Sequence, residues 1–201
     1  DRYASLTDYA AAKARIFTHC DTAVINLDDP LVVAMQHATP RTFTYSLQTA
    51  AAADFSLATN PETHQPWLTR RGEVLLPAAA IKLAGLHNVA NALAALALGE
   101  ALRLPRAAML EELQEFAGLP HRTEWVADVD AVRYLNDSKG TNVGATLAAV
   151  AGLDGPLIVI AGGDGKRQDF APLAAAFRGK VRLAVLIGRD APTLAAVLAD
   201  V

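Results

Sequence analysis

Cysteine is nearly absent from this chain, because Cys20 is the single one among 201 residues. One cysteine excludes an internal disulfide and any zinc site built from several cysteines. It is compatible with a reducing compartment such as the cytoplasm, which is where we expect the protein. His19, His37 and His64 show no metal-ligand spacing, so the histidines predict no metal site of their own.

A strong charge of either sign is also lacking. The 18 lysines and arginines nearly balance the 21 aspartates and glutamates, which gives a formal net charge of −3. This mixture excludes the basic footprint of a nucleic-acid-binding domain and a polybasic membrane patch. With 52% hydrophobic and 19% charged residues, the chain can bury a core and is not predicted to be disordered.

Long hydrophobic runs are missing as well. The most apolar stretch, Val89–Leu104, is interrupted by polar residues and is too short to span a bilayer, so it predicts a buried helix. The chain begins with Asp1-Arg2-Tyr3, which is neither an initiator methionine nor the start of a signal peptide. We therefore expect no membrane or targeting segment, and we expect the sequence to be a piece of a longer protein.

The first part of the chain predicts a small α/β domain. Helix formers dominate Asp8–His19, and Asp28-Asp29-Pro30 is a turn or helix-start signal. β-rich runs predict strands at 22–27 and 41–47, a connection over 48–66, and a hairpin of 66–70 with 73–76. Two helices follow, the first from Asn88, which can cap it, to Leu102, and the second over 106–116, with Pro105 at its first position and Gly118 ending it.

The second part alternates strands and helices. A hairpin of 124–127 with 131–136 turns at Asp128-Val129-Asp130, and strands at 132–135, 157–161 and 181–187 are separated by helices at 143–151, 170–177 and 192–199. Continuous apolar strands separated by helices predict a doubly wound, Rossmann-like parallel sheet that is covered on both faces. We therefore predict two partial α/β domains, at residues 1–118 and 119–201.

Polar loops follow the three predicted strands of the second domain. They are Asn136–Asn142, Gly162–Lys166 and Gly188–Asp190. Because the carboxyl ends of parallel strands lie at one edge of a sheet, Asp137, Lys139, Lys166 and Arg189 are predicted to gather around one crevice that suits phosphates and carboxylates.

Simpler interpretations of these residues stay open. The glycines can be ordinary turn residues, each lysine can be a solvated surface group, and Asn88 can be an N-cap. His121-Arg122 can be a surface loop, Lys13 a solvated helix lysine, and Asp28-Asp29 a helix cap or metal ligands. Gly162-Gly163 does not have the spacing of a dinucleotide fingerprint.

Six segments nevertheless occur in the order found in one family. They are DRY at 1–3, AAKARIF at 11–17, HNVANALAALAL at 87–98, GLPHRTE at 118–124, YLNDSKGTNVGAT at 134–146 and GGDGK at 162–166. Through them the chain resembles the Mur ligase family. The NDSKGTN segment is similar to the corresponding segment in the branch of that family that adds D-glutamate. The resemblance implies an ATP- and Mg²⁺-dependent ligase that joins D-glutamate to UDP-N-acetylmuramoyl-L-alanine in cytoplasmic peptidoglycan synthesis, a monomer when complete.

The resemblance also implies roles for single residues. Lys13 resembles the lysine that is carbamylated to bridge magnesium. Asn88 and Asn91 resemble the residues that contact adenine. Arg122 and Asp137, with His121 beside them, resemble residues that hold the nucleotide. Lys139 and Thr141 resemble active-site residues near the phosphate and the incoming amino acid. Lys166 resembles the lysine that binds a carboxylate of D-glutamate.

The chain departs from the family pattern in what it lacks. No phosphate loop of the form G-x-x-x-x-G-K-[ST] occurs in it. The resemblance places the family's metal-binding histidine two residues before Asp1, the uridine-nucleotide domain before that, and a further substrate loop beyond Val201. We therefore expect residues 1–201 alone to be inactive.

Two alternatives remain at this point. A sister amide ligase such as a folylpolyglutamate synthase has the same fold, although NDSKGTN disfavours it. A non-catalytic nucleotide-binding module explains the glycines at the strand ends, but not the order of Lys13, Asn88 and Asp137.

Overall fold

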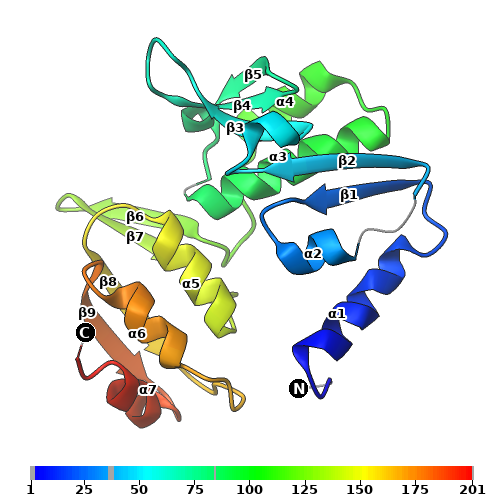
Figure 1. Ribbon diagram of the computed structural model, residues 1–201. Coiled ribbons are helices and arrows are strands. Elements are labelled where there is room, and N and C mark those ends of the chain that lie inside the picture. Colours follow the sequence, from blue (N-terminus) through cyan, green and yellow to red (C-terminus); the bar gives the residue numbers. More distant parts are fainter. Residues whose placement is uncertain (1–2, 36–38, 84, 201) are drawn as a thin grey trace. The chain divides into compact units, whose positions relative to one another are not determined.

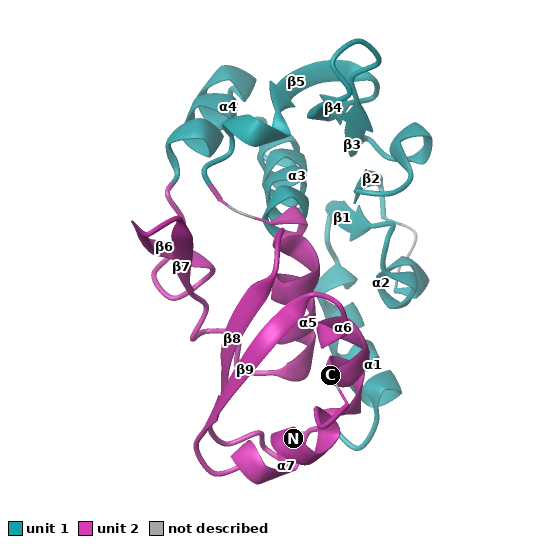
Figure 2. Cartoon of the chain, turned by 90° about the vertical axis from the view of Figure 1, so that its left-hand side faces the viewer, with its two compact units in different colours: residues 1–82, 88–116 teal, residues 83–87, 117–201 magenta. Residues whose placement is uncertain are grey.

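The structure is a computed structural model that describes residues 3–35, 39–83 and 85–200 (Figure 1). Asp1 and Arg2 of the DRY segment, and His37, lie outside the described residues. The chain forms two compact units, unit 1 with residues 1–82 and 88–116 and unit 2 with residues 83–87 and 117–201 (Figure 2). Both contain helices and parallel strands, which confirms the predicted α/β class.

Unit 1 contains a five-stranded mixed sheet. Its order is β1 (Thr22–Asn26), β2 (Arg41–Ser46), β3 (Phe55–Thr59), β4 (Pro66–Arg70) and β5 (Glu73–Pro77). The first three strands are parallel, and β3, β4 and β5 are antiparallel. Strands β1 and β2 and the β4–β5 hairpin were predicted. The prediction of a bare connection over 48–66 was wrong, because it contains β3.

Four helices belong wholly or mostly to unit 1. They are α1 (Leu6–Ala14), α2 (Pro30–Ala34), α3 (Leu86–Ala101) and α4 (Arg106–Glu115). The first predicted helix ends early, because the chain tightens into a 3₁₀ turn at Arg15–Phe17. Pro105 occupies the N-cap position of α4 rather than its first helical position. Within the part of the chain that the structure describes, no helix is both long and apolar enough to cross a bilayer.

Unit 1 buries apolar side chains of its sheet and of one face of α3. Buried side chains of the sheet include Ile25, Phe43, Phe55 and Leu68, and α3 buries Val89, Ala92, Leu93, Leu96 and Ala97. The three- and four-residue spacing in α3 is that of a single helix face. An ion pair of Arg70 with Glu100 ties β4 to α3, and an ion pair of Arg106 with Glu73 ties α4 to β5.

Unit 2 contains two separate two-stranded sheets. β6 (Glu124–Val129) and β7 (Val132–Asn136) form an antiparallel hairpin, and β8 (Leu157–Gly162) lies parallel to β9 (Val181–Ile187). The hairpin turns at Asp130 and Ala131, with φ of 48° and 62°, as in a type I′ turn. The predicted turn at 128–130 was therefore slightly misplaced. The prediction that β7 shares the sheet of β8 and β9 was wrong, because β7 pairs with β6.

Three helices cover one side of β8 and β9 (Figure 1). They are α5 (Val143–Gly152), α6 (Ala171–Phe177) and α7 (Ala191–Val197). The core beneath them consists of Val150, Leu173, Phe177, Leu194 and Leu198.

The side chains that alternate with the core residues of β8 and β9 are exposed. We call them the open face, which consists of Ile158, Ile160, Leu183, Val185 and Ile187, all between 41% and 71% exposed. The prediction that both faces of this sheet are covered was therefore wrong for the described residues.

Candidate functional site

Asp137 organises the loop that follows β7. Its half-buried carboxylate accepts two hydrogen bonds at Oδ1, from the Thr123 backbone N–H at 2.9 Å and from the Thr123 hydroxyl at 3.3 Å. Its carbonyl oxygen accepts a hydrogen bond from the Gly140 N–H at 2.8 Å. Asp137 therefore holds its own loop in a tight turn and also fixes the segment around Thr123.

The His121 segment is attached to the same loop at further points. The Lys139 N–H donates to the His121 carbonyl at 3.0 Å, and the Asn136 amide lies 2.9 Å from His121 Nδ1. The His121 N–H donates to Glu124 Oε2 at 2.8 Å. These bonds join the GLPHRTE and NDSKGTN segments, whose His121 and Lys139 side chains are exposed to solvent, as is the side chain of Arg122.

Gln168 links this loop to the next one. Its side-chain oxygen accepts a hydrogen bond from the Val143 N–H at 2.9 Å, at the start of α5, and its side-chain nitrogen donates to the Gly165 carbonyl at 3.1 Å. Asn142 caps α5 by accepting from the Ala145 N–H at 2.9 Å. Thr141, directly before this cap, is exposed at the helix N-terminus.

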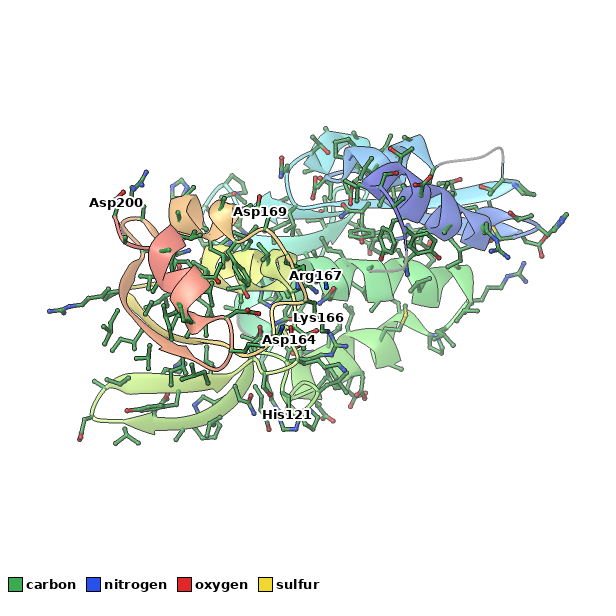
Figure 3. All side chains as sticks on the ribbon, turned by 90° about the horizontal axis from the view of Figure 1, so that it is seen from below. His121, Asp164, Lys166, Arg167, Asp169 and Asp200 are labelled. Carbon is green, nitrogen blue, oxygen red and sulfur yellow. The ribbon has the colours of Figure 1, made fainter. Side chains whose placement is uncertain are left out.

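The loops after β8 and β9 are joined in turn. Asp190 accepts a hydrogen bond from the Gly165 N–H at 2.6 Å, and the exposed Arg189 and Asp164 lie 3.5 Å apart as an ion pair. Asp164, Lys166 and Arg167 lie together in the loop after β8, away from Asp200 at the other end of the unit (Figure 3). The three polar loops of unit 2 thus form one connected surface, on which the Lys166 side chain is exposed.

Glycine permits the close crossing of the last two loops. A Cβ atom at Gly162 would lie 1.8 Å from the Ile187 carbonyl oxygen, and one at Gly188 would lie 2.7 Å from the Gly163 nitrogen. Any side chain at these positions would force the loops apart. The turn interpretation of these glycines is therefore supported, and they act by letting the loops approach each other.

The candidate residues of unit 1 lie on two helices. Lys13 is exposed on α1, with its ammonium nitrogen 5.4 Å from the centroid of the Tyr9 ring. Asn88 is buried on α3 and its side-chain oxygen accepts a hydrogen bond from the exposed Asn91 at 3.3 Å. The prediction that Asn88 caps this helix was wrong, because the helix already begins at Leu86.

Asp28 and Asp29 have structural roles. Asp28 accepts hydrogen bonds from the Ser46 hydroxyl at 2.5 Å and the Leu47 N–H at 2.7 Å, and Asp29 caps α2. Among the described residues, no group of three or more histidine, cysteine, aspartate or glutamate side chains is arranged to hold a metal ion. Because the Asp29 side chain accepts from the Leu31 and Val32 N–H groups, the helix-cap interpretation of Asp29 is confirmed.

Sequence reasoning missed Gln168 as the link between loops and Thr123 as the partner of Asp137. Gln168 carries no sequence signal, because its role depends on two contacts made by tertiary folding. Thr123 had a signal, since it lies inside the GLPHRTE segment.

Comparison with known sequences identifies the family. The Mur ligase middle domain matches residues 1–99, and the Mur ligase, glutamate ligase domain, matches residues 121–201. The chain belongs to the Mur ligase family. It is 51% identical over 202 residues to the UDP-N-acetylmuramoylalanine–D-glutamate ligase of Nitrosococcus oceani, in a match that covers 100% of this chain and 44% of that Mur ligase. The chain thus spans less than half the length of the curated relatives it matches.

Solved Mur ligase structures share the fold. MurF from Acinetobacter baumannii superimposes with a TM-score of 0.71 at 18% identity, covering 96% of this chain and 44% of that one. MurF from Thermotoga maritima, solved in complex with ADP, superimposes with a TM-score of 0.58 at 16% identity, covering 89% of this chain and 46% of that one. At such low identity these similarities describe the fold alone.

Proposed function

We propose that the chain is part of an ATP-dependent ligase that adds D-glutamate to UDP-N-acetylmuramoyl-L-alanine in cytoplasmic peptidoglycan synthesis. The observation that carries this proposal is the 51% identity, over the whole chain, to a ligase of that name. We assign residues 1–118 to the middle domain of such a ligase and residues 119–201 to its C-terminal domain. The two family matches, at 1–99 and 121–201, support this division.

Unit 2 would supply the groups that receive the nucleotide and the amino acid. We assign Arg122 and Asp137, with His121 beside them, to the binding of ATP. We assign Lys139 and Thr141 to contacts with the phosphate and the incoming amino acid. Lys166 is assigned to a carboxylate of D-glutamate. The hydrogen bonds through Gln168 and Asp190 support this assignment, because they hold the loops that carry these residues in one connected surface. Exposed cations beside the N-terminus of α5 favour anionic ligands.

Unit 1 would supply contacts to adenine from Asn88 and Asn91 on α3. We assign Lys13 to the carbamylated lysine of the family. Carbamylation would replace its ammonium group with an oxygen ligand, which suits magnesium. When bound, magnesium would neutralise phosphate charge, but the described residues do not form a cluster that holds it, and we assign it no step.

The proposed reaction has two steps. The terminal carboxylate of UDP-N-acetylmuramoyl-L-alanine attacks the γ-phosphate of ATP, which yields an acyl phosphate and ADP. The amine of D-glutamate then attacks the acyl carbon, and inorganic phosphate leaves as the amide bond forms. In this scheme Lys139 neutralises charge on the transferring phosphoryl oxygens and Lys166 orients D-glutamate.

A substrate panel on the gene product that contains residues 1–201 tests the proposal. Phosphate release should require ATP, UDP-N-acetylmuramoyl-L-alanine and D-glutamate together, with L-glutamate inactive. Turnover of pteroyl-glutamate instead would indicate a folylpolyglutamate synthase and overturn the proposal. Binding of ADP without any turnover would favour a non-catalytic nucleotide-binding module.

Two variants sharpen the same assay. Lys166→Ala should raise the KM for D-glutamate on the order of tenfold to a hundredfold, because a charge-assisted contact to a carboxylate is lost. Arg182→Ala, an exposed cation on β9, is the matched control and should leave this KM unchanged. Residues 1–201 alone should release no phosphate, because the sequence contains no phosphate loop. Steady release from pure chain would contradict that expectation.

A further inference from the structure

Thr123 has a backbone conformation that its side chain disfavours. Its φ is 46°, in the left-handed region, and the residue is only 6% exposed. A β-branched residue with positive φ is an uncommon and strained arrangement. Such a conformation persists only where surrounding contacts fix it, and it tends to occur at functional sites.

Contacts on two sides hold Thr123 in place. Its N–H and its hydroxyl both donate to Asp137 Oδ1, at 2.9 Å and 3.3 Å, and its hydroxyl oxygen lies 3.2 Å from His87 Nε2. The hydroxyl has one proton, which it donates in the hydrogen bond to the Asp137 carboxylate. His87 must therefore donate from Nε2, as the Nε2–H tautomer of the neutral ring does.

The surroundings of His87 agree with this tautomer. Its Nδ1 is buried and has no hydrogen-bond partner among the residues that the structure describes. A Cβ atom at Gly85 or at Gly152 would each lie 2.9 Å from Nδ1, so two glycines leave room for the ring. Burial lowers the pKa of His87, which keeps the ring neutral.

We propose that Thr123 and His87 are positioning residues that orient the Asp137 carboxylate for a nucleotide. This inference rests on the proposed function only in taking Asp137 as a nucleotide contact. His87 donates to Thr123, and Thr123 donates twice to Oδ1, so one carboxylate oxygen is fixed and the orientation of the other follows from it. The strained φ of Thr123 directs both donors toward the same oxygen.

A matched pair of variants tests this role in the gene product that contains residues 1–201, with ADP as the probe. Thr123→Val keeps the branched shape and removes the hydroxyl, whereas Thr123→Ser keeps the hydroxyl and removes a methyl group. Thr123→Val should weaken ADP binding about tenfold, as expected for one lost hydrogen bond to a charged group. Thr123→Ser should bind ADP within about twofold of the parent, because its donor remains.

A second measurement separates positioning from simple loss of structure. In an Asp137→Ala background, Thr123→Val should cause no further loss of ADP affinity, because its target is already missing. Losses that add, or a Thr123→Val variant that binds ADP like the Ser variant, would overturn the inference. If Thr123→Val does not fold, His87→Leu against His87→Gln gives the same comparison, since glutamine retains a donor.

The outcomes distinguish this inference from the proposed function. ADP binding that depends on the Thr123 hydroxyl, without any D-glutamate ligation, would support the positioning role and contradict the ligase. D-glutamate ligation by a protein whose ADP affinity does not change when Thr123 or His87 is replaced would support the ligase and contradict the positioning role. A gene product that binds no ADP would overturn both.

Discussion

The parallel strands of the two units differ in how their side chains are covered. In unit 1, β1 buries Ala23 and Ile25 and leaves its alternate residues half-buried. In unit 2, the alternate residues of β8, Ile158 and Ile160, are 62% and 71% exposed although they are as apolar as the inward ones. The comparison teaches that an apolar strand sequence indicates that both faces of the strand are suited to burial. Whether a face is buried depends on the helices or strands that pack against it.

The largest expected effect contrasts the core of unit 2 with its open face. Phe177 is fully buried, so Phe177→Ala should lower the free energy of unfolding of unit 2 by about 3–5 kcal/mol. Ile160→Ala should change it by less than about 0.5 kcal/mol, because the side chain is already in water. Urea unfolding measured by tryptophan fluorescence can follow each unit separately in single-tryptophan variants, because Trp67 lies in unit 1 and Trp125 in unit 2. Equal losses for the two variants would show that the open face is covered in solution.

The next effect concerns the ion pair that joins sheet and helix in unit 1. Arg70 and Glu100 are 22% and 18% exposed, whereas Arg106 and Glu73 are 38% and 56% exposed. Glu100→Gln should lower the free energy of unfolding of unit 1 by about 1–3 kcal/mol at neutral pH, because a hydrogen-bonded, poorly solvated pair loses its charge. Glu73→Gln, the matched control, should cost less than about 1 kcal/mol.

The same pair predicts an acid dependence for unit 1. The hydrogen bond from Arg70 lowers the pKa of Glu100 below its usual value. The stabilisation is therefore complete above the unfolded-state pKa, about 4.3, and is lost as pH falls through the lower folded-state pKa. The difference in the free energy of unfolding between the parent and Glu100→Gln, measured in urea, should disappear at acid pH. A gap that persists at the lowest pH would contradict this account.

A smaller effect, in the opposite unit, comes from His87. Burial lowers its pKa, while the charge of Asp137 acts in the other direction. Below the unfolded-state pKa of about 6.5 the unfolded chain binds more protons than the folded one, so the stability of unit 2 falls as pH drops through this window. His87→Gln should remove this part of the pH dependence, which unfolding curves at neutral and mildly acidic pH would reveal. An unchanged slope would mean that His87 titrates normally.

The smallest effect on folding should come with a change in association. Ile160→Lys should alter the free energy of unfolding by no more than about 0.5 kcal/mol, yet it interrupts a contiguous apolar surface. Sedimentation should then show less self-association than the parent at high concentration. Val74→Lys is the control, since Val74 is a 55% exposed apolar residue on β5 of unit 1. Equal changes from both variants would mean that the open face has no special role.

Much of the fold could be predicted because local signals mark it. The β4–β5 hairpin, the β6–β7 hairpin and the helices of unit 2 all follow from periodicity and from glycine and proline at their ends. β3 was missed because Phe55 and Ser56 are both buried, which removes the alternation, and because Ser56 is satisfied by a 2.7 Å hydrogen bond to Thr69 on β4. Such a pairing has no local signal.

Sequence reasoning about the candidate site reached the level of segments. NDSKGTN and GLPHRTE pointed to Asp137, Arg122 and their neighbours. The structure joins these two segments through a backbone hydrogen bond from Lys139 to His121 and through the hydrogen bond from the Thr123 N–H to the Asp137 carboxylate. The orientation of Asp137 could not be predicted, because it depends on the left-handed conformation of Thr123 and on a contact of Thr123 with His87, which lies 36 residues before Thr123 in the sequence. A pattern of residues in the sequence predicts neither a left-handed backbone conformation nor a contact between residues far apart in the chain.

The crossing of glycines between the loops after β8 and β9 has a consequence for mutational scanning. In the proposed ligase, a scan that scores only catalysis should rank Gly162 and Gly188 beside the charged residues assigned to ligands, because any side chain there would displace the loop that carries Lys166. Neither glycine has a functional group that could take part in chemistry. Pairing each activity score with a measure of folding and with substrate affinity would separate spacer positions of this kind from residues that contact a ligand.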